Sequence, residues 1–422
     1  MDVLALVIFL GVIILAFIRK VNVGVIALAA GVVAVRLFSL KDGDIINGIS
    51  SSMFATLVSI TLLFAIVNST GALELMARKI ISLAGKRVWV IPIVVYIAGF
   101  VVAGVGPGAV PALAIIPAIA VSVALESGYN PIMLALIGEG GLMAGRMTPI
   151  TPEAAVISTV AAEAGFGNVM PTILICQTIT TIVFSVVVYL IFKGYKLKVP
   201  LNPIVASDLG KFNYKQIISL GSIVVMMALM IFGGINIGLS AFLVSGVLLL
   251  FNVADDSACI KALPWPTIVM VLGVGALMGI VNEAGGITLM SNGLSSIMNQ
   301  YTAIPFMGIS AGLLSMVSSA LGVVYPTMMP MAPDIASKVG GISPVALMAA
   351  VGVGGSLAGV SPLSTGGALI MAAIGTAKKK FTKEEQSKTF VQLFGMAAVG
   401  LVVIVIMAAM FFNAVSRGVY NA

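Results

Sequence analysis

The sequence predicts an all-α membrane protein made of two inverted-topology repeats, each with five spanning helices and one re-entrant hairpin. Three observations support this fold class. Hydrophobic residues make up 60% of the 422 positions and charged residues only 9%, whereas about a quarter of the residues are charged in a soluble chain. Segments of the first half recur in order in the second half. Lys and Arg gather in alternate loops, as the positive-inside rule requires.

The internal repeat is visible in three pairs of segments. The first pair is separated by 214 residues and has six identical positions among eleven, the second pair has the same offset, and the third follows a deletion of one residue. The pairs are Ile66–Met76 with Ile280–Met290, Ile137–Gly145 with Val351–Gly359, and Thr148–Ile157 with Ser361–Ile370. Two copies of one apolar unit are typical of membrane transporters, whose sites lie between the copies.

Each half contains five apolar runs that suit a bilayer crossing, for which a helix needs about 20 residues. In the first half they are Val3–Ile18, Val21–Phe38, Phe54–Asn68, Pro131–Ala162 and Met170–Phe192. In the second half they are Gln216–Phe232, Asn236–Val253, Trp265–Asn282, Pro344–Gly375 and Phe390–Phe412. Between the third and fourth runs lie the Pro- and Gly-rich stretches Val88–Leu125 and Ile304–Ala336. Their central turn signals favour a hairpin that enters and leaves on one side, with two separate crossings as the alternative.

The predicted organisation is a first repeat over 1–192, a cytoplasmic linker over 193–215 and a second repeat over 216–422. The scaffold helices are expected over 1–87 and 216–300. The hairpins and broken helices are expected over 88–192 and 301–422. The first run is not a convincing signal peptide, because Asp2 precedes it and Arg19 and Lys20 follow it, the reverse of a signal peptide.

The Lys and Arg residues test this arrangement independently, because five crossings per half turn the second repeat upside down. With Arg19 and Lys20 inside, 17 of the 22 cations fall inside, as the positive-inside rule requires. The other fifteen are Arg78, Lys79, Lys86, Arg87, Lys193, Lys196, Lys198, Lys211, Lys215, Lys261, Lys378, Lys379, Lys380, Lys383 and Lys388. Outside lie Arg36, Lys41, Lys338 and Arg417, and Arg146 lies within the membrane. The sequence therefore predicts a multi-pass protein of the inner (cytoplasmic) membrane with both termini outside.

Composition excludes several functional classes. The chain has no His, so it lacks the usual zinc ligand, the usual general base and any Ser-His-Asp triad. We therefore expect neither an enzyme nor a cofactor. The net charge of +7 does not indicate a nucleic-acid partner, because the cations lie in short loops between apolar runs. The two cysteines, Cys176 and Cys259, cannot form a disulfide framework.

The fourth apolar run of each half cannot be one continuous helix. Glycines at 138, 140, 141 and 145 lead into Thr148–Pro152, and glycines at 352, 354, 355 and 359 lead into Ser361–Thr365. Proline removes a backbone donor and Gly lowers the cost of non-helical angles. Unwound backbone in a bilayer must be buried in protein or line a wet cavity, where carbonyls suit cations and half-helix N-termini suit anions. A packing kink is the alternative, but two breaks in register favour a binding site.

Three ionisable residues lie within apolar sequence: Glu139, Arg146 and Glu153. A charge at this depth costs at least about 2.5 kcal/mol on insertion scales and by default marks a pathway or a partner. Glu139 and Arg146 are seven residues apart, so one hypothesis is a permanent structural pair. In the other, Arg146 binds a substrate carboxylate bidentately, and Glu139 or Glu153 holds it when the site is empty. The second half has Val353 and Val360 in place of Glu139 and Arg146.

The hairpin turns are weaker candidates for ligand contact. Gly104–Gly108 and Ser318–Gly322 are expected at the tips, facing the broken helices, but a turn needs such residues in any case. Asn68 and Asn282 each precede a glycine by three residues, and helix capping explains them better than a duplicated site.

Four segments carry a family resemblance that covers the whole length. They are NVGVIALAAGVVAV (Asn22–Val35), TLVSITLLFAIVNSTGALE (Thr56–Glu74), GPGAVP (Gly106–Pro111) and SPLSTGGAL (Ser361–Leu369). The chain resembles the ion transporter superfamily, and within it the malonate/dicarboxylate carrier (MatC) group. The resemblance implies a scaffold that forms a homodimer and a transport domain that moves as an elevator. The related divalent anion/sodium symporter (DASS) family holds carboxylates and Na⁺ with Ser-Asn-Thr motifs, which this chain lacks.

The residues and the resemblance together predict a secondary active transporter in a lipid bilayer. Its expected substrate is a small organic anion, a C3–C4 dicarboxylate such as malonate or succinate. The expected coupling ion is Na⁺, which suits carbonyls and hydroxyls, or H⁺, for which Glu139 offers a site. Expected substrate ligands are Gly106, Pro107, Gly108, Arg146, Thr148, Pro149, Thr151, Ser319, Ser361, Pro362, Ser364 and Thr365. Expected ion ligands, including a possible Na⁺ site, are Gly145, Thr148, Ser318, Gly322, Gly359 and Ser361.

Three other functions are weighed against this one. The first is an exporter or exchanger of another anion within the same superfamily. The second is an ion channel, against which the inverted repeat and the paired breaks argue. A membrane-embedded enzyme is the least consistent, because Asp255 and Asp256 lie in a loop and no His is available.

Overall fold

The structure is a computed structural model that describes residues 1–85, 87–197, 209–316, 318–378 and 381–420. Throughout these ranges the regular elements are helices, and no strand occurs. Seven helical segments of the described chain are long and apolar enough to cross a membrane, and shorter apolar helices accompany them. The prediction of an all-helical, multi-pass membrane protein is confirmed. Lys86, Lys198, Lys379 and Lys380, predicted on the cytoplasmic side, lie outside the described residues.

Each predicted apolar run contains a helix, and the fourth run of each half is split in two, as predicted. The first half has α1 (Asp2–Arg19), α2 (Val23–Leu37), α3 (Asp42–Gly48), α4 (Ser51–Ser69), α5 (Ala72–Ser82), α6 (Ile91–Gly104), α7 (Ala109–Ser127), α8 (Pro131–Gly145), α9 (Pro152–Glu163) and α10 (Met170–Ile191). The second half has α11 (Tyr214–Ile231), α12 (Ile237–Leu250), α13 (Asp256–Lys261), α14 (Trp265–Glu283), α15 (Gly286–Ser296), α16 (Ala303–Ser315), η4 (Ala320–Val324), α17 (Tyr325–Met328), η5 (Met329–Met331), α18 (Ala332–Val339), α19 (Pro344–Leu357), η6 (Ala358–Val360), α20 (Thr365–Ala377), α21 (Lys383–Met407), η7 (Ala408–Phe412) and α22 (Asn413–Val419).

Equivalent helices begin with the same capping residue in both halves. The Asn22 side chain accepts a hydrogen bond from the Gly24 amide (2.9 Å) and starts α2. The Asn236 side chain, 214 positions later in the sequence, accepts one from the Gly238 amide (2.8 Å) and starts α12. A side-chain oxygen at this position satisfies an otherwise free amide of the first turn. The repeat therefore specifies the same local structure twice.

Left-handed glycines separate the third long helix of each half from an amphipathic helix. Gly71, with a φ of 72°, lies between α4 and α5, and Gly285, with a φ of 82°, lies between α14 and α15. Their amides donate to the carbonyl oxygens of Asn68 and Asn282 (both 2.9 Å). Only Gly adopts this backbone conformation without steric cost. The predicted capping role of these two Asn-Gly segments is confirmed.

The two halves interlock by exchanging equivalent helices. α2 packs against α14, and α4 packs against α12, so each contact joins the second long helix of one half to the third of the other. A Cβ atom at Gly24 would overlap the carbonyl oxygen of Val269, and one at Gly273 would overlap that of Gly24. Small residues let membrane helices approach this closely. Neither scaffold pair can therefore form within one half alone.

Each hairpin packs against its own broken helix through glycines. α6 lies along α8, and α16 lies along α19. A Cβ atom at Gly141 or Gly145 would overlap the carbonyl oxygen of Tyr96 or Phe100, and one at Gly354 would overlap that of Gly308. The glycines before each break therefore lie in regular helix and serve close packing. The breaks themselves begin only at Arg146 and at η6.

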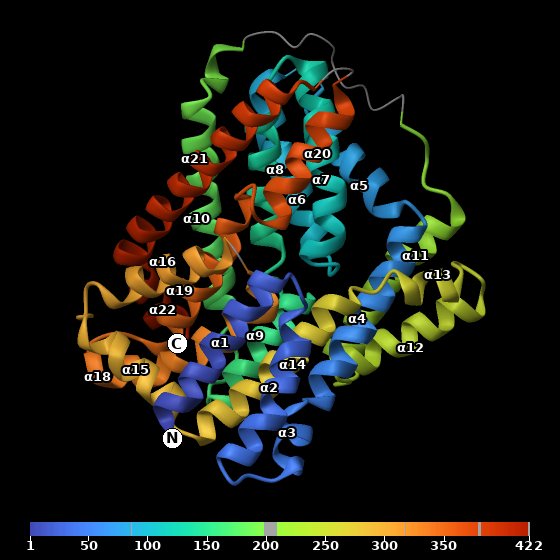
Figure 1. Cartoon of the computed structure of the whole chain (residues 1–422). Helices are drawn as coiled ribbons and strands as arrows, with labels where there is room; N and C mark the ends of the chain where they lie inside the picture. The colour runs from blue at the N-terminus through green and yellow to red at the C-terminus, as the bar shows by residue number, and fades with distance from the viewer. Residues whose placement is uncertain (86, 198–208, 317, 379–380, 421–422) are drawn as a thin grey trace.

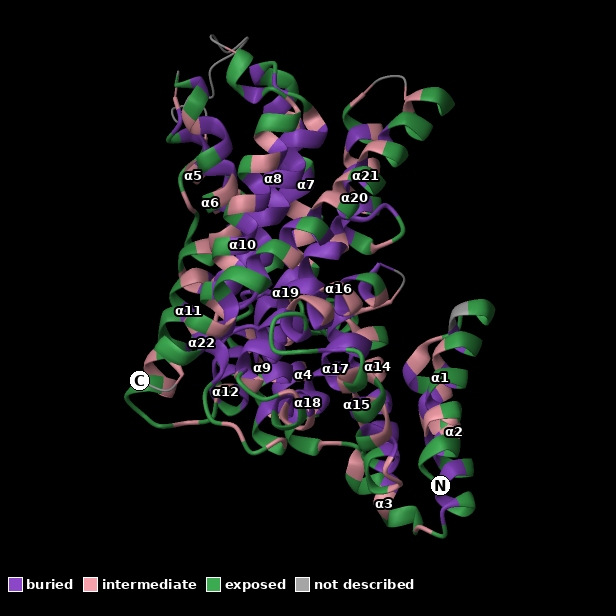
Figure 2. Cartoon of the chain, turned by 90° about the vertical axis from the view of Figure 1, so that its left-hand side faces the viewer, coloured by how far each residue is buried: buried purple, intermediate pink, exposed green. Residues whose placement is uncertain are grey.

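The helices divide into an upper and a lower group in two perpendicular views (Figures 1 and 2). α6, α7, α8 and α20 lie in the upper half, whereas α1, α2, α3, α14 and both termini lie in the lower half. Burial is greatest along the second broken helix: in the most apolar window of Pro344–Ala377, 89% of residues are buried, against 22% in Tyr214–Ile231. The broken helices therefore occupy the centre of the molecule, and α11 lies at its periphery.

Candidate functional site

A cavity of about 420 Å³, here called the central cavity, lies where both hairpin tips meet both helix breaks. The first hairpin contributes the N-terminal turn of α7, and the first break contributes a guanidinium and a carboxylate. The second hairpin and second break contribute mainly hydroxyl-bearing and small residues. The residues from these four segments are Ala109, Val110, Arg146, Glu153, Ser318, Ser319, Ala320, Leu321, Gly359, Leu363, Ser364, Thr365 and Gly366. The four segments predicted to form the site therefore come together in space.

Two threonines fix the first break. The Thr148 hydroxyl donates to the Gly104 carbonyl oxygen at the end of α6 (2.6 Å). The Thr151 hydroxyl donates to the Arg146 carbonyl oxygen (2.5 Å) and accepts from the Ala154 amide (3.2 Å), so Thr151 caps α9. Both hydroxyls satisfy backbone groups that the break leaves free. They hold the shape of the break, and neither side chain lines the central cavity.

The charged residues of the first break form a buried pair. Arg146 Nη2 lies 3.2 Å from Glu153 Oε1, and their side chains are only 10% and 2% exposed. The same Glu153 oxygen accepts a hydrogen bond from the Ala109 amide at the start of α7 (3.0 Å). Because Glu153 also lies in the first turn of α9, its carboxylate is stabilised by two helix N-termini. Arg146 Nε and Glu153 Oε2 are buried and have no hydrogen-bond partner within the described structure.

The predicted pairing of Arg146 with Glu139 is wrong, because Arg146 pairs with Glu153 instead. The spacing of seven residues places two side chains on one face only in a continuous helix. α8 ends at Gly145, and Arg146 is its C-cap, where the chain turns toward α9. The break that creates the cavity therefore also turns the guanidinium away from Glu139.

Glu139 lies at the second break rather than the first. Its side chain is completely buried, and within the described residues neither carboxyl oxygen has a hydrogen-bond partner. A Cβ atom at Gly366 would lie 3.0 and 3.2 Å from these oxygens, and 2.6 Å from the Gly359 carbonyl oxygen. Gly366 is in the first turn of α20 and is the repeat counterpart of Glu153. A carboxyl group therefore lies beside the N-terminal turn of each half-helix, α9 and α20.

Serine hydroxyls line the opposite wall of the central cavity. The Ser319 side chain accepts from the Gly322 amide (3.1 Å), and Ser318 donates to the Leu314 carbonyl oxygen (2.7 Å). Ser315 donates to the Gly355 carbonyl oxygen (2.5 Å) and joins α16 to α19. Ser356 lines the cavity and, among the described atoms, its buried hydroxyl has no partner. Ser315 and Ser356 lie within apolar helices, where a serine gives no sequence signal of a site.

The predicted site residues divide into two groups. Arg146, Ser318, Ser319, Gly359, Ser364 and Thr365 line the central cavity. Pro107 lines a larger neighbouring cavity. The others line neither of these two cavities, and their ligand role stays a prediction: Gly106, Gly108, Gly145, Thr148, Pro149, Thr151, Gly322, Ser361 and Pro362.

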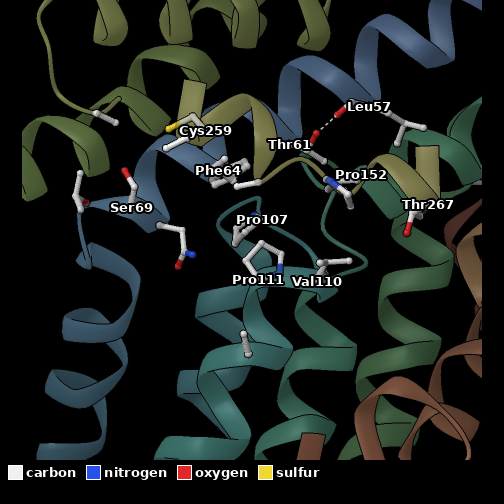
Figure 3. Close-up of a pocket in the computed structure, with 18 of the residues that line it drawn as sticks. Leu57, Thr61, Phe64, Ser69, Pro107, Val110, Pro111, Pro152, Cys259 and Thr267 are labelled. Atoms are coloured by element: carbon white, nitrogen blue, oxygen red, sulfur yellow. Dashed lines mark hydrogen bonds between the residues drawn. The ribbon is translucent and has the colours of Figure 1, made fainter. Parts of the chain in front are cut away.

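The neighbouring cavity, here called the linker-side cavity, has a volume of about 780 Å³. It lies between the first hairpin tip and α4, and Figure 3 shows Pro107, Val110 and Pro111 facing the side of Phe64. It extends to Lys215 at the start of α11 and shares Val110, Glu153, Thr267 and Leu321 with the central cavity. The central cavity is therefore accessible from the side where the chain passes from α10 to α11.

A third cavity of about 1070 Å³, here called the far-side cavity, lies between the start of α4, α14 and η5. Its lining has no residue in common with the other two cavities. Asn282 lines it, whereas Asn68, the repeat counterpart, lines the linker-side cavity. Sequence analysis explained these two asparagines by capping alone, although their recurrence at equal spacing was the signal that marks both cavities.

Comparison with known proteins gives one family and two similar structures. A family model described as citrate transporter matches residues 13–352. The YdaH transporter of Alcanivorax borkumensis is 13% identical with a TM-score of 0.59, covering 87% of this chain and 86% of that one. MtrF of Neisseria gonorrhoeae, described as illuminating a class of antimetabolite efflux pumps, is 15% identical with a TM-score of 0.56, covering 87% and 82%. At these identities the likeness shows the fold alone. No curated protein matches the chain.

Proposed function

The chain belongs to the citrate transporter family, and from this premise we propose that it is a secondary active transporter of a small organic anion. It is a transporter of the ion transporter superfamily and not an enzyme. The observation that carries the proposal is the central cavity, where a buried guanidinium, the N-termini of α7 and α20 and several hydroxyls face one space. Such groups favour an anion in a low-dielectric site.

We propose a C3–C4 dicarboxylate, such as malonate or succinate, as the substrate. One carboxylate would bind Arg146, because a guanidinium offers two parallel donors to a carboxylate. The second would meet the hydroxyls of Ser319, Ser364 and Thr365 on the opposite wall. Citrate is the second candidate, because the family model carries that description. The assignment to the malonate/dicarboxylate carrier group rests on the sequence resemblance.

The coupling ion is proposed to be Na⁺ or H⁺. The Gly359 carbonyl oxygen beside the Glu139 carboxyl group offers neutral and acidic oxygen ligands at one place. The helices packed against α8 are α6, α7, α10, α19 and α20, and none of them contains Lys or Arg. A carboxylate without a counter-charge is costly at this depth. Glu139 therefore suits a proton, or a cation that arrives with the substrate.

An elevator mechanism between two inverted repeats, in a homodimer, is the proposed mode of transport. The exchange of α2 and α4 with α14 and α12 supports one scaffold built from both halves. The separate placement of α6, α7, α8 and α20 above it (Figure 1) supports a second body that moves. Because the central cavity joins the linker-side cavity, the proposed state of this structure is open to the cytoplasm.

The test is binding and uptake by the purified full-length protein. Malonate, succinate and citrate would be compared in a thermal-shift screen, with Na⁺ or K⁺ present and at two pH values. Uptake of the best ligand into proteoliposomes would then be measured under a Na⁺ or a pH gradient. We expect at least one of the three acids to stabilise the protein and to accumulate against its gradient. Absence of both effects for all three acids would contradict the proposal.

A further inference from the structure

We propose that Glu153 is a resident substitute for a substrate carboxylate. In the empty carrier its side chain occupies an anion site between Arg146 and the N-terminus of α7, and the substrate carboxylate displaces it. This inference rests on the proposed function, because it requires a carboxylate substrate at Arg146. It adds a role for Glu153 that transport of an anion does not by itself require.

The contacts of Glu153 are those expected of a bound carboxylate ligand. One oxygen accepts from both Arg146 Nη2 (3.2 Å) and the Ala109 amide (3.0 Å). Ala109 is the first residue of α7, a helix of 19 residues whose N-cap residue, Gly108, makes no side-chain hydrogen bond. The start of a helix with no cap of its own is an anion site. Glu153 fills that site from another element.

The pair is also incomplete, which leaves a substrate something to gain. Arg146 Nε and the second Glu153 oxygen are both buried, and within the described structure neither has a partner. A free carboxylate can approach the guanidinium with two parallel hydrogen bonds, which are stronger and more directional than one. A side chain tethered to α9 at Glu153 does not reach this geometry here. The substrate is therefore able to outcompete the resident group.

The local structure does not require a carboxylate at this position for α9 itself. Thr151 caps α9 with its own side chain, and Pro152 occupies the first turn. In the second repeat the counterpart of Glu153 is Gly366, which lines the same cavity without a side chain. The two breaks therefore share their backbone design, but only the first one carries its own anion.

The surroundings of Glu153 allow the exchange. Gly108, with a φ of 70°, has no Cβ, and a Cβ atom there would overlap Glu153 Oε2. Glu153 lines both the central and the linker-side cavities, so a displaced carboxylate has a space to enter. Either carboxylate would neutralise Arg146, so the guanidinium keeps a partner in the empty and the loaded carrier. An unpaired buried charge is strongly destabilising, so the empty carrier of the wild type returns easily.

Glu153→Gln tests this exchange in the full-length protein, with Glu126→Gln as the matched control. Glu126 is an exposed carboxylate near the far end of α7 and lines none of the three cavities described above. Without its competitor, the Gln variant should bind malonate or succinate about tenfold more tightly by calorimetry, which corresponds to about 1.4 kcal/mol. In proteoliposomes it should keep exchange of internal for external substrate and lose net uptake, because its empty state leaves Arg146 unpaired. Glu126→Gln should match the wild type in all three measurements.

Three outcomes separate this inference from the proposed function. If the wild type binds none of the carboxylates, the proposed function fails first. If the wild type binds one and Glu153→Gln binds it equally or more weakly, Glu153 is a fixed structural group and the inference is overturned. If the Gln variant does not fold, Glu153→Asp is measured instead. Its shorter side chain should loosen the contact with Ala109 and also tighten substrate binding, and unchanged or weaker binding would again overturn the inference.

Discussion

Arg146 is the single cation of the described broken helices, and its charge and its shape can be tested separately. Lys at this position keeps the charge and a contact with Glu153, but it lacks the fork that binds a carboxylate bidentately. We expect Arg146→Lys to fold with a normal thermal stability and to bind the substrate at least about tenfold more weakly, since charge-assisted hydrogen bonds contribute about 1.5–3 kcal/mol. Calorimetry of the purified variant measures this, and an unchanged dissociation constant would leave Arg146 with a structural role only.

Glu139 allows a decision between the two coupling ions at the residue scale. Glu139→Gln keeps the shape of the buried side chain and removes its ability to exchange a proton. If H⁺ is the coupling ion, this variant should bind substrate yet lose accumulation driven by a pH gradient in proteoliposomes. Glu126→Gln is again the control, since its carboxylate is exposed. Accumulation that persists under a pH gradient in the Glu139 variant would exclude Glu139 as the proton site.

Sequence analysis found the charged residues of the site but not their partners. Arg146, Glu139 and Glu153 are identified by the rarity of charge in apolar sequence. Their pairing depends on the direction of the chain after Gly145, which a spacing rule for regular helices does not describe. Asn68 and Ser356 line cavities, yet nothing in their local sequence separates them from ordinary capping or packing residues. Such contacts are set by long-range packing.

At the scale of single elements, the contact between α6 and α8 makes a clear stability prediction. A Cβ atom at Gly141 would overlap the backbone carbonyl of Tyr96, which cannot move aside as a side chain can. Gly141→Ala should therefore destabilise the protein by about 1–3 kcal/mol, the usual cost of overpacking. Gly246→Ala in α12 is the control, because nothing lies within 4 Å of its Cβ position. There the better helix propensity of Ala should be neutral or stabilising.

Thermal unfolding in detergent, followed for both variants and the wild type, measures this difference. A lower melting temperature for Gly141→Ala alone is expected. Equal melting temperatures for the two variants would mean that α6 and α8 are free to separate, and the hairpin would then not be a rigid unit.

The elements were predictable where Pro and Gly punctuate the sequence. The first hairpin turns at Val105–Gly108, between α6 and α7, as the run Gly104–Gly108 predicts. The second is less regular: after Ser319 the chain forms a π-helical turn, η4, and then the short elements α17 and η5. A π-turn depends on tertiary context and has no strong sequence signature. The position of the second tip was therefore predictable, but its shape was not.

At the scale of the whole molecule, the predicted topology can be tested with single cysteines. Cys176 and Cys259 are buried and would be replaced by Ala to give a cysteine-free background. A cysteine at Asp2, at the N-terminus, and one at Lys196, after α10, should then react with a membrane-impermeant reagent from opposite sides of intact cells. The physical reason is the clustering of 17 of the 22 cations on one predicted side, since cations are retained in the cytoplasm. Labelling of both positions from one side would contradict the inverted arrangement.

The overall arrangement followed from the sequence because the repeat and the charge pattern are independent of each other and agree. The described structure adds that both termini lie in its lower half (Figure 1), which fits the prediction that they face the same side. Relative placement of the upper and lower groups was not predictable, because periodicity describes each helix but not how one body of helices stands against another.

The exchange of helices between the halves has a consequence for how the chain is made. α2 finds its partner only in α14, through Gly24 and Gly273. At a synthesis rate of about 5–20 residues per second, Gly24 leaves the ribosome on the order of ten seconds or more before Gly273 does. During that interval α2 presents a strip of small residues to lipid or to the insertion machinery, with no helix to cover it. Biogenesis is thus a problem of waiting: the first-made helices must remain inserted and unassociated until the last third of the chain begins to arrive.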